Sequence, residues 1–529
     1  MLLLKNANVL TLNPRQPHAE TVLIEGTRIK AVGSMDQMSQ LCGKDPEALD
    51  LGGKTLLPGF VDCHIHPILY AFFLMNIDLN RMRTMEELLE CIRAKASEAS
   101  PDQWLLGLRF NEESLKEQKL PTLAMLDEAA PDNSFVIMRY CGHLAIANSK
   151  ALALAGITKN TADPDGGEIE RDSNGELTGV LRETAISMVL EQMPPPDWDQ
   201  FSGAIVQTFD ELAGKGITGI HGIVQTGEMG PSGKLGYLAI SAMKAMREKI
   251  PLRMYLMIVA TEASQIEELQ ASELHDTGPD SMCKVGAWKM ICDGSLGGHS
   301  AVMFEPYTDR PEFSGIMVWS EEELEKMIRE GHTRGIQLSM HCIGDRMVHV
   351  VLEILERVMA ESPRNDHRHR IEHASIMGPK IIKCAKELGM VMSVQPPFIS
   401  SEASWMGKRI GERTKYIYPF RSFFENNLTV CAGSDGPVEI PDPIHGIYAS
   451  VNRLGLATEE AITAEQAVHM YTTHAACAAF EEDIKGTIEP GKLADLVVLS
   501  DDPLSVSQEE LQNLQVEMTI VGGKVVYSR

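Results

Sequence analysis

The chain has 529 residues, of which 44% are hydrophobic and 23% charged, and its formal net charge is −26. This length is too great for one small domain and is sufficient for a complete barrel with additions. The strong negative charge disfavours nucleic acid and anionic membranes as partners, because both would repel it. The charge says nothing about a small neutral substrate.

No apolar run reaches the roughly 18 residues that a membrane-spanning helix requires. The apolar N-terminus is interrupted at Lys5, so it indicates a strand and not a signal peptide. Ten cysteines are scattered from Cys42 to Cys477 without a CxxC pair. In a chain of this length that pattern favours reduced thiols and a cytoplasmic location. A homodimer is the expected oligomer, since closed two-fold assemblies are the commonest.

Both ends of the chain alternate like β-strands. Residues 1–57 predict one strand over 2–12 and a hairpin of 21–24 with 28–32. Residues 484–529 predict an apolar strand and a second hairpin across Gly522-Gly523. Neither end is long enough for a core of its own. The two ends are therefore predicted to form one composite β-sandwich.

Residues 58–70 and 206–483 alternate strands with amphipathic helices, which is typical of a parallel barrel. The helix expected at 321–331 places Leu324, Met327 and Ile328 on one face. The number of candidate strands matches the TIM (β/α)8 barrel. These strands are expected at 60–64, 217–221, 252–260, 284–292, 337–342, 369–374, 390–395 and 428–433.

The stretch 71–205, between the first and second barrel strands, is far longer than a βα loop. It predicts helices at 85–96 and 148–155 and a strand at 135–140. We therefore expect an inserted α/β subdomain at the barrel end where active sites lie. Two interpretations of it stay open: a lid that sets substrate specificity, and a structural embellishment.

The strongest local signal is PGFVDCHIHP at 58–67. Side chains two apart in a strand point the same way, so His64 and His66 can bind one metal ion together. An HxH pair alone is equally well explained by two histidines with ordinary hydrogen-bond partners.

Four further residues extend this signal. Lys289 lies in an apolar strand, where burial would lower the pKa of its amine. A neutral amine can take up carbon dioxide and become a carbamate that bridges two cations; an ion pair with Asp293 is the alternative. His341, His373 and Asp435 each lie at the end of a candidate strand, where a barrel places catalysis. Each has a structural explanation alone, but together with the HxH pair they predict a metal centre.

These segments resemble the amidohydrolase superfamily, in particular the amidohydrolase-3 group with its YtcJ-like proteins and N-substituted formamide deformylases. The resemblance runs nearly end to end. It rests on PGFVDCHIHP, GHLAIANSKAL, GELTGVLRETA, KMICDGSLGG, HCIGD, HRIEHA, GSDGPV and GTIEPGKLADLVVL.

The resemblance implies a barrel with a composite β-sandwich and one or two divalent ions, zinc first, with manganese or iron as alternatives. One departure is Gly222 after His221, where relatives often carry an acid. By position, the resemblance assigns one ion to His64, His66, carboxylated Lys289 and Asp435, and the other to Lys289, His341 and His373.

The resemblance also implies hydrolysis of a non-peptide carbon–nitrogen bond, an amide or N-formyl/N-acyl bond, of a small molecule. Asp435 would act as general base and then as general acid. His143 would stabilise the developing oxyanion. The alternatives are an aminohydrolase acting on a ring C=N, which generally lacks the bridging lysine, a phosphoesterase of another HxH class, and a non-catalytic scaffold, which predicts missing ligands.

Other residues receive weaker predictions. Phe398, Trp405 and Tyr416 follow the seventh barrel strand and are candidates for lining an apolar pocket, with simple packing as the alternative. Several histidines without metal-ligand spacing are not expected to bind an ion. They are His18, His275, His332, His349, His445 and His469.

Overall fold

The computed structural model describes residues 1–39, 41, 46–139, 144–164, 167–228 and 236–529. The chain divides into two compact units, one of residues 1–69 with 205–529 and one of residues 70–204. None of the helices in the described part has the length and apolar character that crossing a membrane requires.

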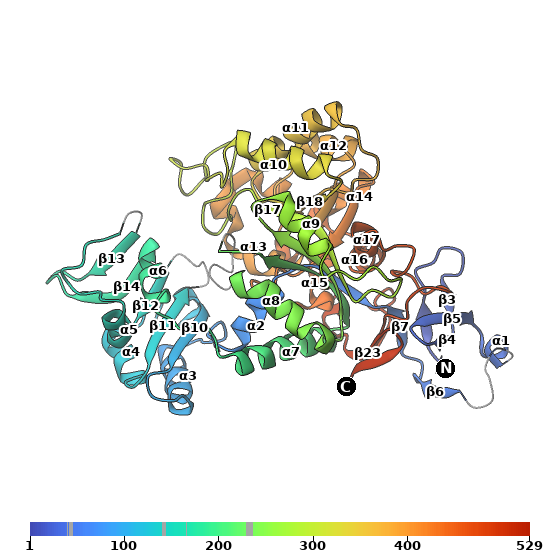
Figure 1. The fold of residues 1–529 in the computed structure, drawn as a ribbon, viewed down its shortest axis with the longest axis horizontal. Helices are drawn as coiled ribbons and strands as arrows, with labels where there is room; N and C mark the ends of the chain where they lie inside the picture. Colours follow the sequence, from blue (N-terminus) through green and yellow to red (C-terminus); the bar gives the residue numbers. More distant parts are fainter. Residues whose placement is uncertain (40, 42–45, 140–143, 165–166, 229–235) are drawn as a thin grey trace. The chain divides into compact units, whose positions relative to one another are not determined.

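The larger unit contains an eight-stranded parallel sheet whose strands follow one another in chain order (Figure 1). Each strand corresponds to one that the sequence predicts, and the arrangement is consistent with the predicted TIM barrel. The strands are β8 (Phe60–Ile65), β15 (Ile217–Gln225), β16 (Arg253–Val259), β17 (Cys283–Ile291), β18 (Gln337–Cys342), β19 (Arg370–His373), β20 (Val391–Val394) and β21 (Thr429–Ala432).

The barrel closes where the segment after β21 meets β8. Ile65 forms a parallel bridge with Gly436. The backbone N–H of Asp435 donates to the carbonyl of His64 at 2.6 Å, and the N–H of His66 donates to the carbonyl of Gly436 at 2.8 Å. Closure therefore brings the HxH segment and Asp435 together, although they lie at opposite ends of the barrel sequence.

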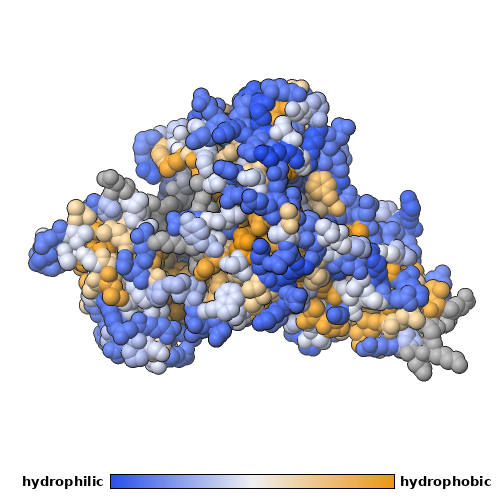
Figure 2. Space-filling view, in the orientation of Figure 1, coloured by the Kyte–Doolittle hydropathy of each residue, from blue (hydrophilic) through white to orange (hydrophobic). Residues whose placement is uncertain are grey.

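Helices connect the barrel strands. The helix predicted at 321–331 is α10 (Glu321–Thr333), and its predicted face of Leu324, Met327 and Ile328 is buried. Its outward side carries ion pairs, and the surface over α10–α12 is largely hydrophilic in Figure 2. The other helices of this unit beyond residue 205 are α8 (Gly236–Met246), α9 (Ala263–Gln270), α11 (Asp345–Glu361), α12 (Pro379–Glu387), α13 (Pro397–Ile410), α14 (Phe420–Glu425), α15 (Pro443–Asn452), α16 (Ala464–Met470) and α17 (Thr473–Ala478).

Strands from both chain ends pair in one six-stranded sheet. Its central pair is antiparallel, with Leu496 opposite Pro58. Apolar residues of both ends share one core cluster, from Leu4 and Val22 to Leu496 and Ile520. The strands of this sheet are β24 (Lys524–Ser528), β23 (Val516–Val521), β22 (Leu496–Leu499), β7 (Thr55–Pro58), β2 (Asn8–Leu10) and β3 (His18–Ala19).

The single strand predicted over 2–12 is wrong. Asn6 has a φ of 53°, in the left-handed region that an extended strand cannot include. The chain therefore breaks there: the residues after Asn6 enter the six-stranded sheet as β2, while those before it belong to a second sheet, which orders β5, β4, β1 and β6. These strands are β1 (Leu2–Lys5), β4 (Thr21–Glu25), β5 (Arg28–Gly33) and β6 (Glu47–Asp50), with α1 (Met35–Ser39) after β5.

The smaller unit has its own six-stranded sheet and two apolar core clusters. The predicted helices at 85–96 and 148–155 are α3 (Met85–Glu98) and α5 (Ser149–Leu154), and the predicted strand is β11 (Ser134–Arg139). The other strands are β9 (Ile77–Asp78), β10 (Trp104–Phe110), β12 (Leu144–Ala147), β13 (Gly167–Arg171) and β14 (Leu177–Glu183). The remaining helices are α4 (Leu123–Ala129) and α6 (Thr184–Leu190), while α2 (Pro67–Leu74) and α7 (Trp198–Gly214) cross the unit boundaries.

Candidate metal centre

Four histidines predicted as ligands meet at the carboxyl ends of the barrel strands. His64 and His66 lie at the end of β8, His341 is in β18, and His373 is the last residue of β19. The ring centroids of His64 and His66 are 5.7 Å apart, those of His64 and His373 4.7 Å, and those of His341 and His373 4.3 Å. Residues more than 300 positions apart in the chain are thus brought into one cluster.

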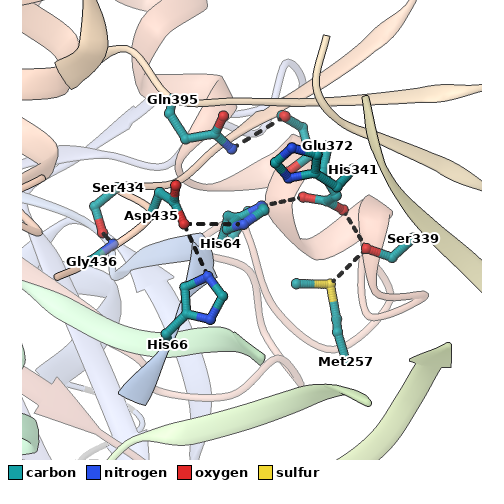
Figure 3. Close-up of polar contacts among 12 residues, drawn as sticks. His64, His66, Met257, Ser339, His341, Glu372, Gln395, Ser434, Asp435 and Gly436 are labelled. Carbon is teal, nitrogen blue, oxygen red and sulfur yellow. Dashed lines mark hydrogen bonds and ion pairs between the residues drawn. The ribbon is translucent and has the colours of Figure 1, made fainter. Parts of the chain in front are cut away.

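Asp435 completes this cluster from the segment after β21. Its Oδ1 lies 3.0 Å from Nε2 of His66 and 3.3 Å from Nε2 of His64 (Figure 3). One donor atom each of His64, His373 and Asp435 lies within 4.8 Å of the others, which suits a shared metal ion. Burial raises the pKa of Asp435, but His64 and His66 outweigh it and hold that pKa well below its usual value.

Two of these residues are in unusual backbone conformations. His373 has a φ of 71° and Asp435 a φ of 61°. Left-handed conformations are costly for residues other than glycine and concentrate at functional sites. At His373 the conformation also interrupts the alternation of β19, so that His373 and Glu372, although adjacent, both contact His64.

The imidazoles are suited to donate lone pairs to a cation. Burial lowers the pKa of His66, lowers that of His373 well below 6.5, and lowers that of His341 to about 3. His64 is the exception: burial lowers its pKa, but Asp435 and Glu372 outweigh burial and Lys289, so its pKa is raised. A site that favours a positive group beside two carboxylates also favours a metal cation.

Lys289 lies in β17 and is 1% exposed. Burial lowers the pKa of its amine. Within the described residues its Nζ has no hydrogen-bond partner, and the same holds for Nδ1 of His66 and of His373. A buried nitrogen without a partner is costly, so these atoms fit a group that the chain itself does not supply, such as a metal ion. The alternative partner of Lys289, Asp293, instead accepts three backbone hydrogen bonds, from Val302, Ile343 and Gly344.

His341 contacts both the histidine cluster and groups outside it. Its ring packs against His373, but its Nε2 lies 3.2 Å from the carbonyl of Gly294 and 3.6 Å from Oδ1 of Asp293. His143, predicted to contact substrate, lies outside the described residues.

The three predicted pocket aromatics have different neighbours. Phe398 packs beside His373, with centroids 6.3 Å apart. Trp405 and Tyr416 instead lie under the cations of Arg409 and Lys415. Of these three aromatic residues, Phe398 is the one that packs against a histidine of the cluster.

Sequence reasoning missed two acids. Glu372 bonds Nδ1 of His64 at 2.6 Å. Asp62 accepts from the backbone N–H of His64 and of Ser434, and so ties β8 to the segment after β21. A signal existed for both, because each carboxylate lies one or two residues from a predicted ligand inside an apolar strand, where an acid requires a partner.

An eight-stranded barrel with a cluster of histidines and a carboxylate at its strand ends is the architecture of a metal-dependent hydrolase. Residues 47–527 match the family model described as amidohydrolase family, so the chain belongs to this family of hydrolases.

Relatives extend over the whole length. The chain is 29% identical to YtcJ of Bacillus subtilis (strain 168), a protein assigned to the amidohydrolases, with 98% of each covered. It is 30% identical to the N-substituted formamide deformylase of Arthrobacter pascens, over 100% of this chain and 98% of that one. A crystal structure of an uncharacterised metal-dependent hydrolase from Pyrococcus furiosus superposes with a TM-score of 0.75 at 25% identity, covering 95% of this chain and 100% of the other.

Proposed function

We propose that this enzyme hydrolyses a non-peptide carbon–nitrogen bond, an amide or an N-formyl or N-acyl bond, of a small molecule. The observation that carries the proposal is the convergence of His64, His66, His373 and Asp435 at the closing edge of the barrel. The likeness to an N-substituted formamide deformylase over the full length supports the class of bond.

Two divalent ions, with zinc as the first choice for a histidine-rich donor set, would be held by the residues of this cluster. His64, His66 and Asp435 would hold one ion, His341 and His373 the other, and carboxylated Lys289 would bridge them. When bound, such ions make water acidic enough to attack at neutral pH and polarise the substrate carbonyl. His341 would exchange its contact with the Gly294 carbonyl for this role.

Asp435 would move the protons of the reaction. It takes a proton from the attacking water as general base and gives it to the leaving nitrogen as general acid. Its lowered pKa keeps the carboxylate ionised beside His64 and His66. His143 stays a prediction as the group that stabilises negative charge on the carbonyl oxygen.

Replacing Asp435 by Asn tests this role. The amide keeps the size and one oxygen ligand but cannot accept the proton, so we expect kcat to fall at least about a hundredfold. Turnover should be followed on N-formyl amines, N-acyl amines and cyclic amides, with the fold checked by circular dichroism. Unchanged kcat would exclude Asp435 as the proton carrier. Release of ammonia from a ring amine as the main activity would instead favour the aminohydrolase alternative.

Replacing Lys289 by Ala tests the bridging carbamate. We expect bound metal to fall from about one or two ions per chain to less than half an ion. Added acetate or propionate should restore it in part, because a free carboxylate can occupy the vacated volume. Lys284→Ala is the matched control, since Lys284 lies in the same strand but pairs with Glu481 at 2.9 Å. Full metal content in Lys289→Ala would contradict the bridge.

A further inference from the structure

Glu372 lies in the barrel interior, fully buried, between His64 and Ser339 (Figure 3). Its Oε2 is 2.6 Å from Nδ1 of His64. Its Oε1 accepts a hydrogen bond of 2.7 Å from the Ser339 hydroxyl. A buried carboxylate with this short contact to a ring nitrogen controls which nitrogen of His64 carries the proton.

Arg370 holds this carboxylate in its ionised form. The Arg370 Nε lies 2.8 Å from Oε1 of Glu372, and both side chains are fully buried. Nη2 of Arg370 also donates to the carbonyl of Cys63 at 2.8 Å and to the hydroxyl of Ser393 at 2.9 Å. Nη1 lies 2.8 Å from Nδ1 of His221. The guanidinium is thus fixed by β8, β15 and β20, and Glu372 cannot turn away from His64 without leaving a buried charge unpaired.

An ionised carboxylate only accepts hydrogen bonds. In the neutral ring, the proton of His64 therefore lies on Nδ1, which has the shorter carboxylate contact, and Nε2 carries the lone pair. Nε2 is also the atom that faces Asp435, at 3.3 Å. Glu372 thus fixes the tautomer through Nδ1, on the side of the ring away from the proposed ion. Nε2, the atom that would bind the ion, faces the ion.

We propose that Glu372, fixed by Arg370, is a positioning residue that holds His64 in its Nδ1–H tautomer before any metal ion binds. This inference rests on the proposed function, because it takes His64 as a metal ligand. It assigns the Arg-Ile-Glu-His segment two separate tasks: His373 is a ligand, while Arg370 and Glu372 orient a ligand from β8.

Glu372→Gln provides the test. Ser339 donates to Oε1, and Arg370 lies closer to Oε1 (2.8 Å from Nε) than to Oε2 (3.3 Å from Nη2). The amide oxygen should therefore take the Oε1 position, and the amide NH2 should face His64. His64 Nδ1 must then accept, which reverses the tautomer. We would measure this by proton–nitrogen NMR of the metal-free, nitrogen-15-histidine-labelled full chain at about pH 9, where imidazole is neutral. His64 would be assigned by its loss in His64→Asn. An unchanged tautomer in Glu372→Gln would overturn the proposal.

Zinc affinity gives a second readout. We expect Glu372→Gln to bind Zn²⁺ about 10- to 100-fold more weakly, measured against a competing chelator. Glu481→Gln is the matched control, since it also removes a buried carboxylate, one paired with Lys284 and Lys485 and not with a histidine. Equal weakening in both variants would show a merely structural effect and would contradict positioning. If the unaltered protein bound no Zn²⁺ while its tautomer matched expectation, the proposed function would fail and the positioning role would stand.

A milder variant covers the case in which Glu372→Gln does not fold. Ser339→Ala removes one hydrogen bond to Oε1 and leaves every charge in place. We expect its affinity for Zn²⁺ to fall about threefold or more, because the carboxylate that orients His64 loses one of its hydrogen bonds. Unchanged affinity in Ser339→Ala would count against the proposal.

Discussion

Histidines in this chain serve two different purposes, and His332 illustrates the second. It lacks metal-ligand spacing, and the structure places it in a buried trio with His367 and His369. Nδ1 of His332 lies 2.9 Å from Nε2 of His369, and Nδ1 of His369 accepts from the backbone N–H of Leu338 at 3.0 Å. The backbone N–H of His369 in turn donates to Nδ1 of His367 at 2.9 Å. Every ring nitrogen that accepts here does so only while its ring is neutral.

We expect this trio to make the folded protein less stable in acid. Burial lowers the pKa of His367 and lowers that of His369 well below 6.5. Below about pH 6.5 the unfolded chain therefore binds more protons than the native one, and the free energy of unfolding falls as the pH falls. Each histidine that stays neutral contributes a slope of up to about 1.4 kcal/mol per pH unit. Melting temperatures between about pH 7 and pH 5 should record this decline.

Variants identify the histidine responsible. His369→Gln should lower the melting temperature at neutral pH but make it less dependent on pH, because one proton-linked group is gone. His349→Gln, at an exposed position paired with Glu353, should leave the pH dependence unchanged. If the melting temperature of His369→Gln kept its full dependence on pH, the trio would not be the cause of the loss of stability in acid.

Much of the site could be predicted from single residues, because residue types that bind metal ions stand where the predicted strands end. The meeting of His64, His66, His373 and Asp435 followed from strand alternation and the rule that a barrel places its chemistry at the carboxyl ends, while the role of Lys289 stays a prediction. The direction of a side chain was not predictable: the left-handed backbone at His373 and the contact of His341 with Gly294 depend on distant segments. Glu372 was missed because alternation places it opposite His373.

Gly433, which follows β21, lies close to β8 at the seam of the barrel. A Cβ added there would lie 2.3 Å from the backbone nitrogen of His64 and 2.7 Å from Oδ1 of Asp62. The first atom is backbone, and the second is held by the backbone N–H groups of His64 and Ser434, so the backbones themselves would have to separate. The glycine thus permits the close approach on which the contact between His64 and Asp435 depends.

Gly433→Ala is therefore expected to damage the seam. We expect a loss of about 1–3 kcal/mol in the free energy of unfolding and weaker Zn²⁺ binding, since β8 and β21 move apart. Gly407→Ala is the matched control, because Gly407 lies in α13 and a Cβ there meets nothing within 4 Å. That change should be neutral or stabilise the helix by up to about 1 kcal/mol. Denaturant unfolding and chelator competition would measure both, and equal behaviour of the two variants would contradict the seam argument.

Elements with a strong apolar pattern were predictable, and short ones were not. The strand predicted at 337–342 has the observed bounds, because polar and apolar residues alternate along QLSMHC between Gly335 and Gly344. In contrast, 2–12 contains two strands of different sheets, since one left-handed residue outweighs a run of apolar neighbours. In the unit of residues 70–204, most strands are short or carry polar residues, so their pairing is set by tertiary contacts.

At the scale of the whole larger unit, one buried ion pair joins the barrel to the C-terminal strands. Arg253, the first residue of β16, donates through Nε to Oδ2 of Asp495 at 2.6 Å and through Nη2 to Oδ1 at 3.2 Å. Asp495 also accepts from the backbone N–H of Gly522, in the turn before β24. Both charged side chains are 5% exposed. The pair lies at the start of a barrel strand, at the end opposite to the metal ligands.

Breaking this pair should cost stability without altering the chemistry. Arg253→Met leaves the Asp495 carboxylate buried and without its cation, which costs about 3–5 kcal/mol. Arg253→Met/Asp495→Leu removes both charges, so its loss should be smaller than the sum of the two single losses, and the difference is the coupling energy. Zn²⁺ affinity should match that of the unaltered chain wherever the variants are folded. Additive losses would mean that the pair does not couple the two ends of the chain to the barrel, and the shared apolar cluster around Leu496 would then have to hold them alone.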